Sequence, residues 1–102
     1  MTQLHRGEGT ARLNEDDAAL ALHALSWIVS DEPRAERLLG MTGLDPDSLR
    51  ASLGKRETLA AILSFLISHE PDLIACADAL DIRPEALAAA ARRLDDHERI
   101  ET

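Results

Sequence analysis

The longest apolar run in the chain, Leu59 to Ile67, constrains the fold most strongly. Every residue in the run except Ser64 is apolar. Because apolar and polar residues do not alternate, the run is not a half-buried strand, and the helix-tolerant residues 55–58 that precede it favour a helix. A helix that is apolar around its whole circumference has to be surrounded by other elements. We therefore expect a central helix around which the rest of the chain packs.

The composition indicates an all-α fold. Aromatic residues make up only 2% of the 102 residues, and Ala and Leu dominate, whereas strands are enriched in β-branched and aromatic residues. A chain of this length forms one domain. We predict a compact bundle of five to six helices over residues 14–95. A disordered N-terminal tail is expected over residues 1–13, and a frayed C-terminal tail over residues 96–102.

Capping residues and prolines divide this bundle into helices. Asn14 is a candidate N-cap for the first helix. Pro33 fits the first turn of the second helix, and Gly43 fits a left-handed C-cap at its end. Asp45 followed by Pro46 is a strong start signal for a short third helix. The expected helices cover about residues 15–30, 33–42, 46–54, 55–67, 71–80 and 84–95.

The chain also contains an apparent internal repeat with an offset of 38 residues. Pro33 and Pro71 are separated by this offset, and so are Pro46 and Pro84. An ungapped alignment of residues 17–54 with 55–92 has eight identical positions, five of them between residues 25 and 33. The pattern predicts two copies of a three-helix unit whose longest helices pack together at the centre. The alternative is that similar helix-start residues arose independently. The predicted structural core is Leu25, Trp27, Ile28, Leu63, Phe65 and Leu66.

Charge and cysteine content narrow the class of protein. The net charge of −8 argues against nucleic acid or anionic membrane as the main partner, because phosphate contacts need basic side chains. The single cysteine, Cys76, excludes an intrachain disulfide and zinc sites built on two or four cysteines, which fits a reducing cytoplasm. The N-terminus lacks the apolar region of a secretory signal, and the run from 59 to 68 is too short to span a bilayer.

The sequence offers no convincing catalytic, cofactor or metal site. His23 and Ser26 share a helix face, but no carboxylate on that helix is spaced to orient the histidine. His69 and Glu70 begin a pattern typical of zinc proteases, yet Leu73 stands where the second histidine is needed. Cys76 lies among apolar residues and is expected to be a small buried side chain. We therefore predict a protein that is not an enzyme and that has no resident cofactor or metal.

A helix-turn-helix is the main alternative. The segment from Ala77 through Asp81, followed by a helix from Pro84, has the layout of such a motif. Recognition helices read base edges with basic or amide side chains near their N-terminus. Here Arg92 and Arg93 come at the other end of the helix, so they are the only candidate nucleic-acid contacts.

Much of the chain resembles an uncharacterised alphaproteobacterial family, domain of unknown function 3572. The resemblance covers residues 21–94. The residues that carry it are Ala24-Leu25-Ser26-Trp27, Asp31-Glu32-Pro33, Leu38-Leu39-x-x-Thr42-Gly43-Leu44-x-Pro46-x-x-Leu49-Arg50, Leu63-x-Phe65-Leu66 with Glu70, and Ile82-x-Pro84-Glu85-Ala86. It implies a small, soluble, all-helical protein and supplies no activity or catalytic residues.

These observations lead to one functional expectation. The two longest predicted helices carry more apolar faces than a small bundle needs to bury, and an apolar patch left on the surface marks an interaction site. We expect a non-enzymatic protein–protein interaction module in the cytoplasm, with a homodimer among the candidate assemblies. A helix-turn-helix regulator that binds nucleic acid is the rival.

Overall fold

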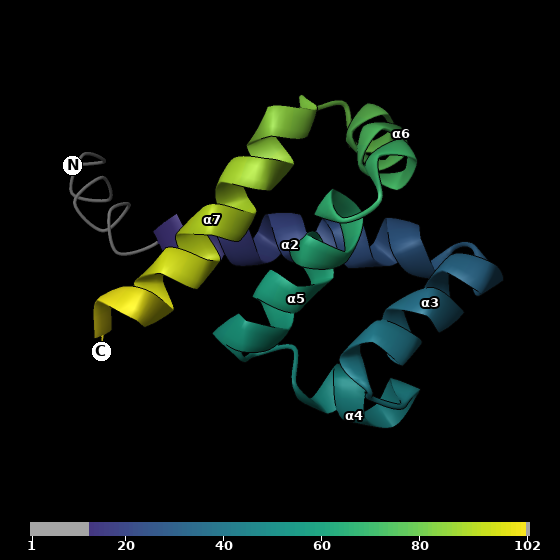
Figure 1. Ribbon diagram of the computed structural model, residues 1–102, viewed down its shortest axis with the longest axis horizontal. Helices are drawn as coiled ribbons and strands as arrows, with labels where there is room; N and C mark the ends of the chain where they lie inside the picture. The colour runs from purple at the N-terminus through teal and green to yellow at the C-terminus, as the bar shows by residue number, and fades with distance from the viewer. Residues whose placement is uncertain (1–12, 102) are drawn as a thin grey trace, which may run out of the picture.

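The computed structural model describes residues 13–101 and shows an all-helical, compact fold (Figure 1). Six helices make up the described part of the chain, so the predicted fold class and helix number are confirmed. Of the predicted N-terminal tail, residues 1–13, the first twelve residues lie outside the described part of the chain, and Leu13 is the first residue of α2. The helices are α2 (Leu13–Val29), α3 (Glu32–Thr42), α4 (Pro46–Ala51), α5 (Arg56–Ile67), α6 (Glu70–Leu80) and α7 (Pro84–Glu101).

The starts of α3 and α4 follow from local capping chemistry. Asp31 accepts a hydrogen bond from the backbone N–H of Arg34 at 3.1 Å and so caps α3. Asp45 accepts one from the backbone N–H of Ser48 at 2.7 Å and caps α4, with Pro46 directly after it. The hydrogen bonds from Ser48 hold the pKa of Asp45 below its usual value, because they stabilise the carboxylate. The predicted capping role of Asp45 is confirmed.

Two helices end in a residue with left-handed backbone geometry. Gly43 ends α3 at φ 76°, as predicted, and Asp81 ends α6 at φ 60°. At the end of α6, the backbone N–H of Ile82 donates to the carbonyl of Ala77 at 2.9 Å. The backbone N–H of Asp81 donates to the carbonyl of Asp78 at 3.1 Å. This is the hydrogen-bond pattern of a Schellman C-cap. Aspartate tolerates the left-handed region better than most residues, which explains its place there without glycine.

Several predicted boundaries differ from the observed ones. Asn14 lies inside α2, which already includes Leu13, so its assignment as an N-cap was wrong. The helix α4 ends at Ala51 rather than near Gly54, because the backbone of Ser52 departs from helical geometry (φ −100°, ψ 8°). The helix α7 continues to Glu101, past the point at which we expected the domain to end.

The helix α5 is the centre of the fold. It packs against α2, α3, α6 and α7, and Figure 1 shows it between the other helices. Its buried residues are Leu59, Ala60, Ile62, Leu63, Phe65 and Leu66. The apolar run is therefore enclosed by neighbouring helices, as predicted for a helix without a polar face.

The second predicted central helix, α2, is buried on one side only. Ala21, Ala24 and Ile28 are fully buried, whereas Leu22 and Val29 remain 39% and 50% exposed. The helix α2 thus packs against α5, as predicted for these two helices, but its opposite side stays open to solvent. The physical reason is the shortness of α4, whose six residues are too few to cover the outer side of α2.

Two of the six predicted core residues lie at the edge of the core. Ile28, Leu63, Phe65 and Leu66 are buried, but Leu25 and Trp27 are only partly buried and pack against the core from outside. The Trp27 ring is covered by the guanidinium of Arg34, which lies 3.6 Å from the ring centre. Arg34 also donates to the Trp27 carbonyl at 3.0 Å. A cation–π contact and a hydrogen bond thus replace core packing at this position.

None of the described helices is by itself long and apolar enough to cross a membrane. The helices α5 and α6 reach that length and hydropathy only as a pair, and the chain bends by 109° between them.

Candidate functional site

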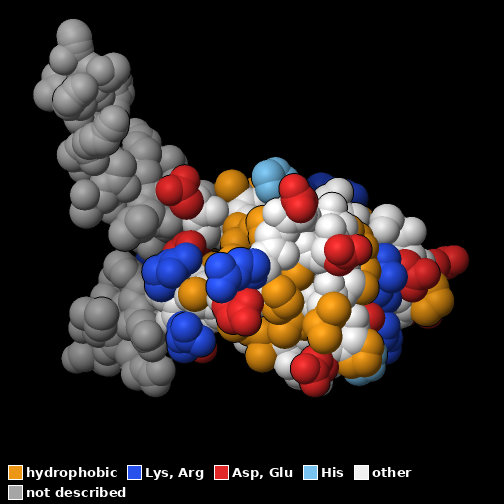
Figure 2. Space-filling model, turned by 90° about the horizontal axis from the view of Figure 1, so that it is seen from above, with side chains coloured by type: hydrophobic (Ala, Val, Ile, Leu, Met, Phe, Trp, Pro, Cys, Tyr) orange, Lys and Arg blue, Asp and Glu red, His pale blue; other side chains and the backbone are white. Residues whose placement is uncertain are grey.

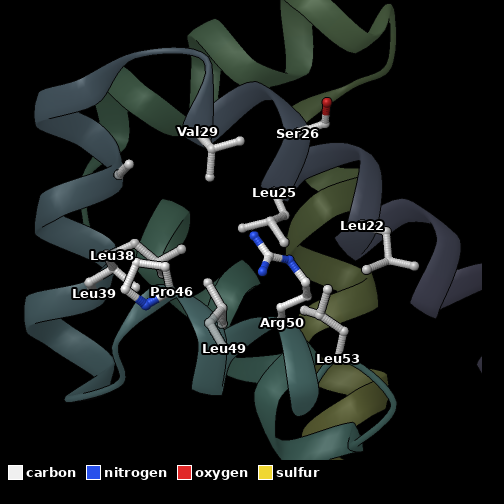
Figure 3. Close-up of a pocket in the computed structure, with 11 residues that line it drawn as sticks. Leu22, Leu25, Ser26, Val29, Leu38, Leu39, Pro46, Leu49, Arg50 and Leu53 are labelled. Carbon is white, nitrogen blue, oxygen red and sulfur yellow. The ribbon is translucent and has the colours of Figure 1, made fainter.

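An apolar groove lies between α2, α3 and α4, on the side of α2 that the core leaves uncovered (Figure 3). Its volume is about 530 Å³. The residues that line it are Leu22, Leu25, Ser26, Val29, Ala35, Leu38, Leu39, Pro46, Leu49, Arg50 and Leu53. A concave, mostly apolar surface of this size is a typical binding site.

The spacing of the lining residues explains how the groove forms. Leu22, Leu25 and Val29 lie three and four residues apart, so they project from one face of α2. From α3, Leu38 forms the buried floor, and Leu49 of α4 is also buried. The short α4 contributes Pro46, Leu49 and Arg50 to the lining.

The polar side chains of Ser26 and Arg50 line the groove, and they point in different directions. In Figure 3 the hydroxyl of Ser26 points away from the groove, whereas the guanidinium of Arg50 points into it, toward Leu25. Arg50 contacts Asp47 at 3.2 Å, but the two side chains are 75% and 94% exposed. Because an exposed ion pair of this kind contributes little to stability, the guanidinium is free to meet another acidic group.

The groove offers mainly apolar contact area to a binding partner. Arg50 is the one charged residue in its lining, and an arginine stays protonated at every physiological pH. His23 and Ser26, which the sequence did not support as a catalytic pair, are exposed to solvent. The groove can therefore hold an apolar side chain or helix face next to an acidic group.

The carboxylate of Asp72 lies outside the groove and meets two basic side chains. Arg37 donates to it at 3.1 Å, and the Nδ1 atom of His69 lies 3.1 Å from it. His69 precedes α6 as its N-cap residue. Within the part of the chain that the structure describes, no three or more His, Cys, Asp or Glu side chains cluster as a metal ion would require.

Arg93, one of the two candidate nucleic-acid contacts, is engaged in an internal ion pair. Its Nε donates to Oδ2 of Asp17 at 2.9 Å, and its terminal nitrogen donates to Oδ1 at 2.8 Å. These hydrogen bonds raise the pKa of Arg93. The neighbouring Arg92 is exposed. Of the two arginines, Arg93 is therefore already paired within the chain, although its side chain is still 51% exposed.

The thiol of Cys76 is fully buried in the core. Burial raises its pKa to about 11, because the thiolate would lose its hydration. A thiol of this kind is a poor nucleophile at neutral pH, since the thiolate is the reactive form. It lies among the packed side chains of the core, as its apolar sequence context indicates.

Some relevant residues were not found from the sequence. Asp17 was not among the candidate site residues, but it is a buried carboxylate paired with a residue 76 positions away. Leu22 and Leu53 were not among the candidate site residues either. Their apolar character was visible, but nothing local indicated which apolar residues would stay uncovered.

The fold is that of a compact all-helical protein, and an open apolar groove lies among its described residues. The chain belongs to the family described as Protein of unknown function (DUF3572), whose model matches residues 14–97. Neither the comparison with curated proteins nor that with solved structures found a match.

Proposed function

We propose that the protein is a non-enzymatic protein–protein interaction module and that the groove between α2, α3 and α4 is its docking surface. The observation that carries this proposal is the exposure of Leu22 (39%) and Val29 (50%) beside an apolar hollow. The cores of protein interfaces are apolar, and arginine is the charged residue enriched there. Arg50 is an arginine of this kind, because it lines the apolar groove.

The exposed side chains supply a driving force for binding. Burying a Leu or Val side chain fully stabilises by about 1.5–3 kcal/mol. Leu22 and Val29 keep roughly half of their surface exposed, so covering them would contribute about 1 kcal/mol each. The other apolar lining residues that are only partly buried, Leu25, Leu39 and Leu53, would add to this amount.

Two features support a role without catalysis. The groove lining holds no carboxylate, histidine or cysteine, so it lacks the groups used for general acid–base or nucleophilic steps. The thiol of Cys76 is buried away from it. We place the protein in the cytoplasm, because a chain with a single cysteine needs no oxidising compartment.

We also propose that the chain consists of two related three-helix units, residues 17–54 and 55–92. The offset of 38 residues seen in the sequence agrees with the helix boundaries: α3 and α6 cover Glu32–Thr42 and Glu70–Leu80, and α4 and α7 begin at Pro46 and Pro84. The left-handed residues Gly43 and Asp81 have the same spacing. These agreements are expected of a duplicated unit.

The helix packing supports a twofold-like relation between these units. The helix α2 packs against α6, and α5 packs against α3, while α2 and α5 pack against each other. Each long helix thus contacts the second helix of the other unit, which a rotation that exchanges the units would produce. The third helices differ, because α7 extends far beyond the length of α4.

Site-directed crosslinking tests the docking surface. A photoreactive amino acid at position 22 should capture a partner in cells, whereas the same group at position 74 on α6 should not. Ile74 is a matched control because it is also an exposed apolar residue (51%) and lies outside the groove lining.

Purified proteins provide the second half of this test. Leu22→Arg should abolish binding of the captured partner, while Ile74→Arg should preserve it, with both variants folded by circular dichroism. Equal crosslinking from positions 22 and 74, or unchanged binding of Leu22→Arg, would contradict the proposal.

A nucleic-acid-binding regulator is the second candidate, and one observation favours it. The junction of α6 and α7 is a tight turn with a left-handed residue, Asp81, as helix-turn-helix motifs have between their helices. A salt-dependent mobility shift with duplex DNA that Arg92→Ala removes would support it. Arg93 should be kept in that experiment, because its pairing with Asp17 gives its removal a structural effect.

A further inference from the structure

We infer that the groove binds a single amphipathic helix of a partner protein, in the place that the continuation of α7 occupies in the second unit. The inference rests on the proposed function and on the proposed relation between the two units. The observation behind it is that Leu22 and Leu25 of the first unit are more open than their equivalents in the second unit.

The two units differ in the length of their third helix. The helix α4 ends at Ala51, whose equivalent in α7 is Ala89, but α7 continues to Glu101. The first turns of this continuation carry Ala90, Ala91 and Leu94, which are 0%, 7% and 1% exposed. The helix α7 packs against α5, α2 and α6. In the first unit, the chain instead turns toward α5 after Ala51.

Pairs of equivalent residues show the consequence. Leu22 is 39% exposed, but its equivalent Ala60 is 7% exposed. Leu25 is only partly buried, whereas its equivalent Leu63 is completely buried. Leu22 and Leu25 are thus more open than their equivalents in the second unit, whereas Val29 (50%) and its equivalent Ile67 (40%) are both exposed. An external helix would cover Leu22 and Leu25.

The comparison of Leu22 with Ala60 also indicates the size of the side chains that a bound helix needs at this position. The first unit carries a leucine where the second has an alanine, so the occupant helix needs small residues where it crosses α2. The continuation of α7 has this character, with Ala90 and Ala91 between Leu87 and Leu94. A helix with a stripe of the pattern Leu-x-x-Ala-Ala-x-x-Leu projects these side chains from one face.

Charge adds a second requirement on the occupant. The residue equivalent to Arg50 is Ala88, so the groove has a guanidinium that the covered surface lacks. In Figure 3 this group points into the groove, and within the described part of the chain it pairs with the exposed Asp47. A carboxylate beside the apolar stripe of the incoming helix would pair with it. The structure therefore favours an amphipathic helix with an acidic flank.

A peptide of residues 84–101 of this chain is a suitable probe, because it carries the apolar stripe followed by Asp95 and Asp96. We expect the labelled peptide to bind the full-length protein saturably by fluorescence anisotropy. In a heteronuclear NMR titration it should shift the amides of Leu22, Leu25 and Leu49 rather than those around Arg93.

Variants then locate the contact. Leu22→Arg should weaken peptide binding at least tenfold, and Arg50→Ala should weaken it about threefold at low salt. Ile74→Arg should leave it unchanged. A peptide with Leu94→Asp should not bind. Retention of thermal stability by the Leu22→Arg protein distinguishes loss of the groove from loss of the fold.

Other outcomes would overturn the inference. One is failure of the peptide to bind, and another is that the peptide shifts amides around Arg93 on α7 instead of those in the groove. A third is that the chain forms a dimer that displaces the peptide and that Leu22→Arg dissociates. The inference would also be overturned if a medium-chain fatty acid displaced the peptide and crosslinking at position 22 captured no helical partner. If crosslinking at position 22 captures a partner but no helical peptide binds, the helix inference fails and the interaction module stands. If both fail, the proposed function fails as well.

Discussion

Asp17 and Arg93 form a bidentate ion pair that joins α2 to α7. Two donor nitrogens of Arg93 reach the two carboxylate oxygens of Asp17 at 2.8 and 2.9 Å. The Asp17 side chain is 5% exposed, whereas that of Arg93 is 51% exposed. The arginine thus supplies the hydrogen bonds that a buried carboxylate requires, and it lies over the carboxylate from the solvent side.

Removal of Arg93 should therefore destabilise the fold. In Arg93→Ala the carboxylate of Asp17 stays in place without its partner, and we expect a loss of about 2 kcal/mol in the free energy of unfolding. Urea denaturation followed by circular dichroism measures it. The adjacent Arg92→Ala is the control, and it should change stability by less than about 0.5 kcal/mol because its side chain is exposed. Similar losses in both variants would contradict a specific role for the pair.

The two left-handed C-caps should respond in opposite directions to substitution. Gly43→Ala should destabilise by about 1 kcal/mol, because the backbone at φ 76° disfavours a Cβ atom. A Cβ at this position would meet no atom within 4 Å, so the cost lies in the backbone alone. Asp81→Gly should be neutral or stabilise by up to about 1 kcal/mol, since glycine adopts φ 60° freely. Thermal melts compare the two variants, and equal signs would refute this account.

The buried thiol of Cys76 should make stability depend on pH in the alkaline range. Its pKa rises from the ordinary value of 9.0 to about 11 on folding. The unfolded chain therefore loses the thiol proton first as pH increases, and the stability that is fully present below pH 9 should be lost progressively toward pH 11. Unfolding at a series of pH values measures this slope. In Cys76→Ala the thiol component of the slope should be absent, and an unchanged slope would assign it to other groups.

The equivalent positions Leu63 and Leu25 should differ strongly in their contribution to stability. Leu63 is completely buried in α5, so Leu63→Ala should cost about 2–5 kcal/mol, the range for a leucine removed from a core. Leu25 is partly buried and lines the groove. Its replacement by alanine should cost clearly less, since the groove side of the residue is already open. Denaturant midpoints test this difference, and equal losses would mean that the groove side of α2 is packed in solution.

The sequence by itself determined the elements of this protein. Helix starts at Pro46 and Pro84, the cap at Asp45 and the left-handed end at Gly43 all depend on residues within one helical turn, so local chemistry was sufficient to predict them. The enclosure of α5 was also predictable, because its apolar run offers no face to water.

Only the tertiary structure decided which apolar residues stay exposed and which charges meet. Burial of Leu22 depends on whether a helix covers the outer side of α2, and the early end of α4 at Ala51 leaves that side open. The pairing of Asp17 with Arg93 depends on the packing of α7 across α2, over a separation of 76 residues. Both are long-range outcomes of packing, and residue type within one helix does not determine them. The candidate groove therefore became visible only once the helices were placed.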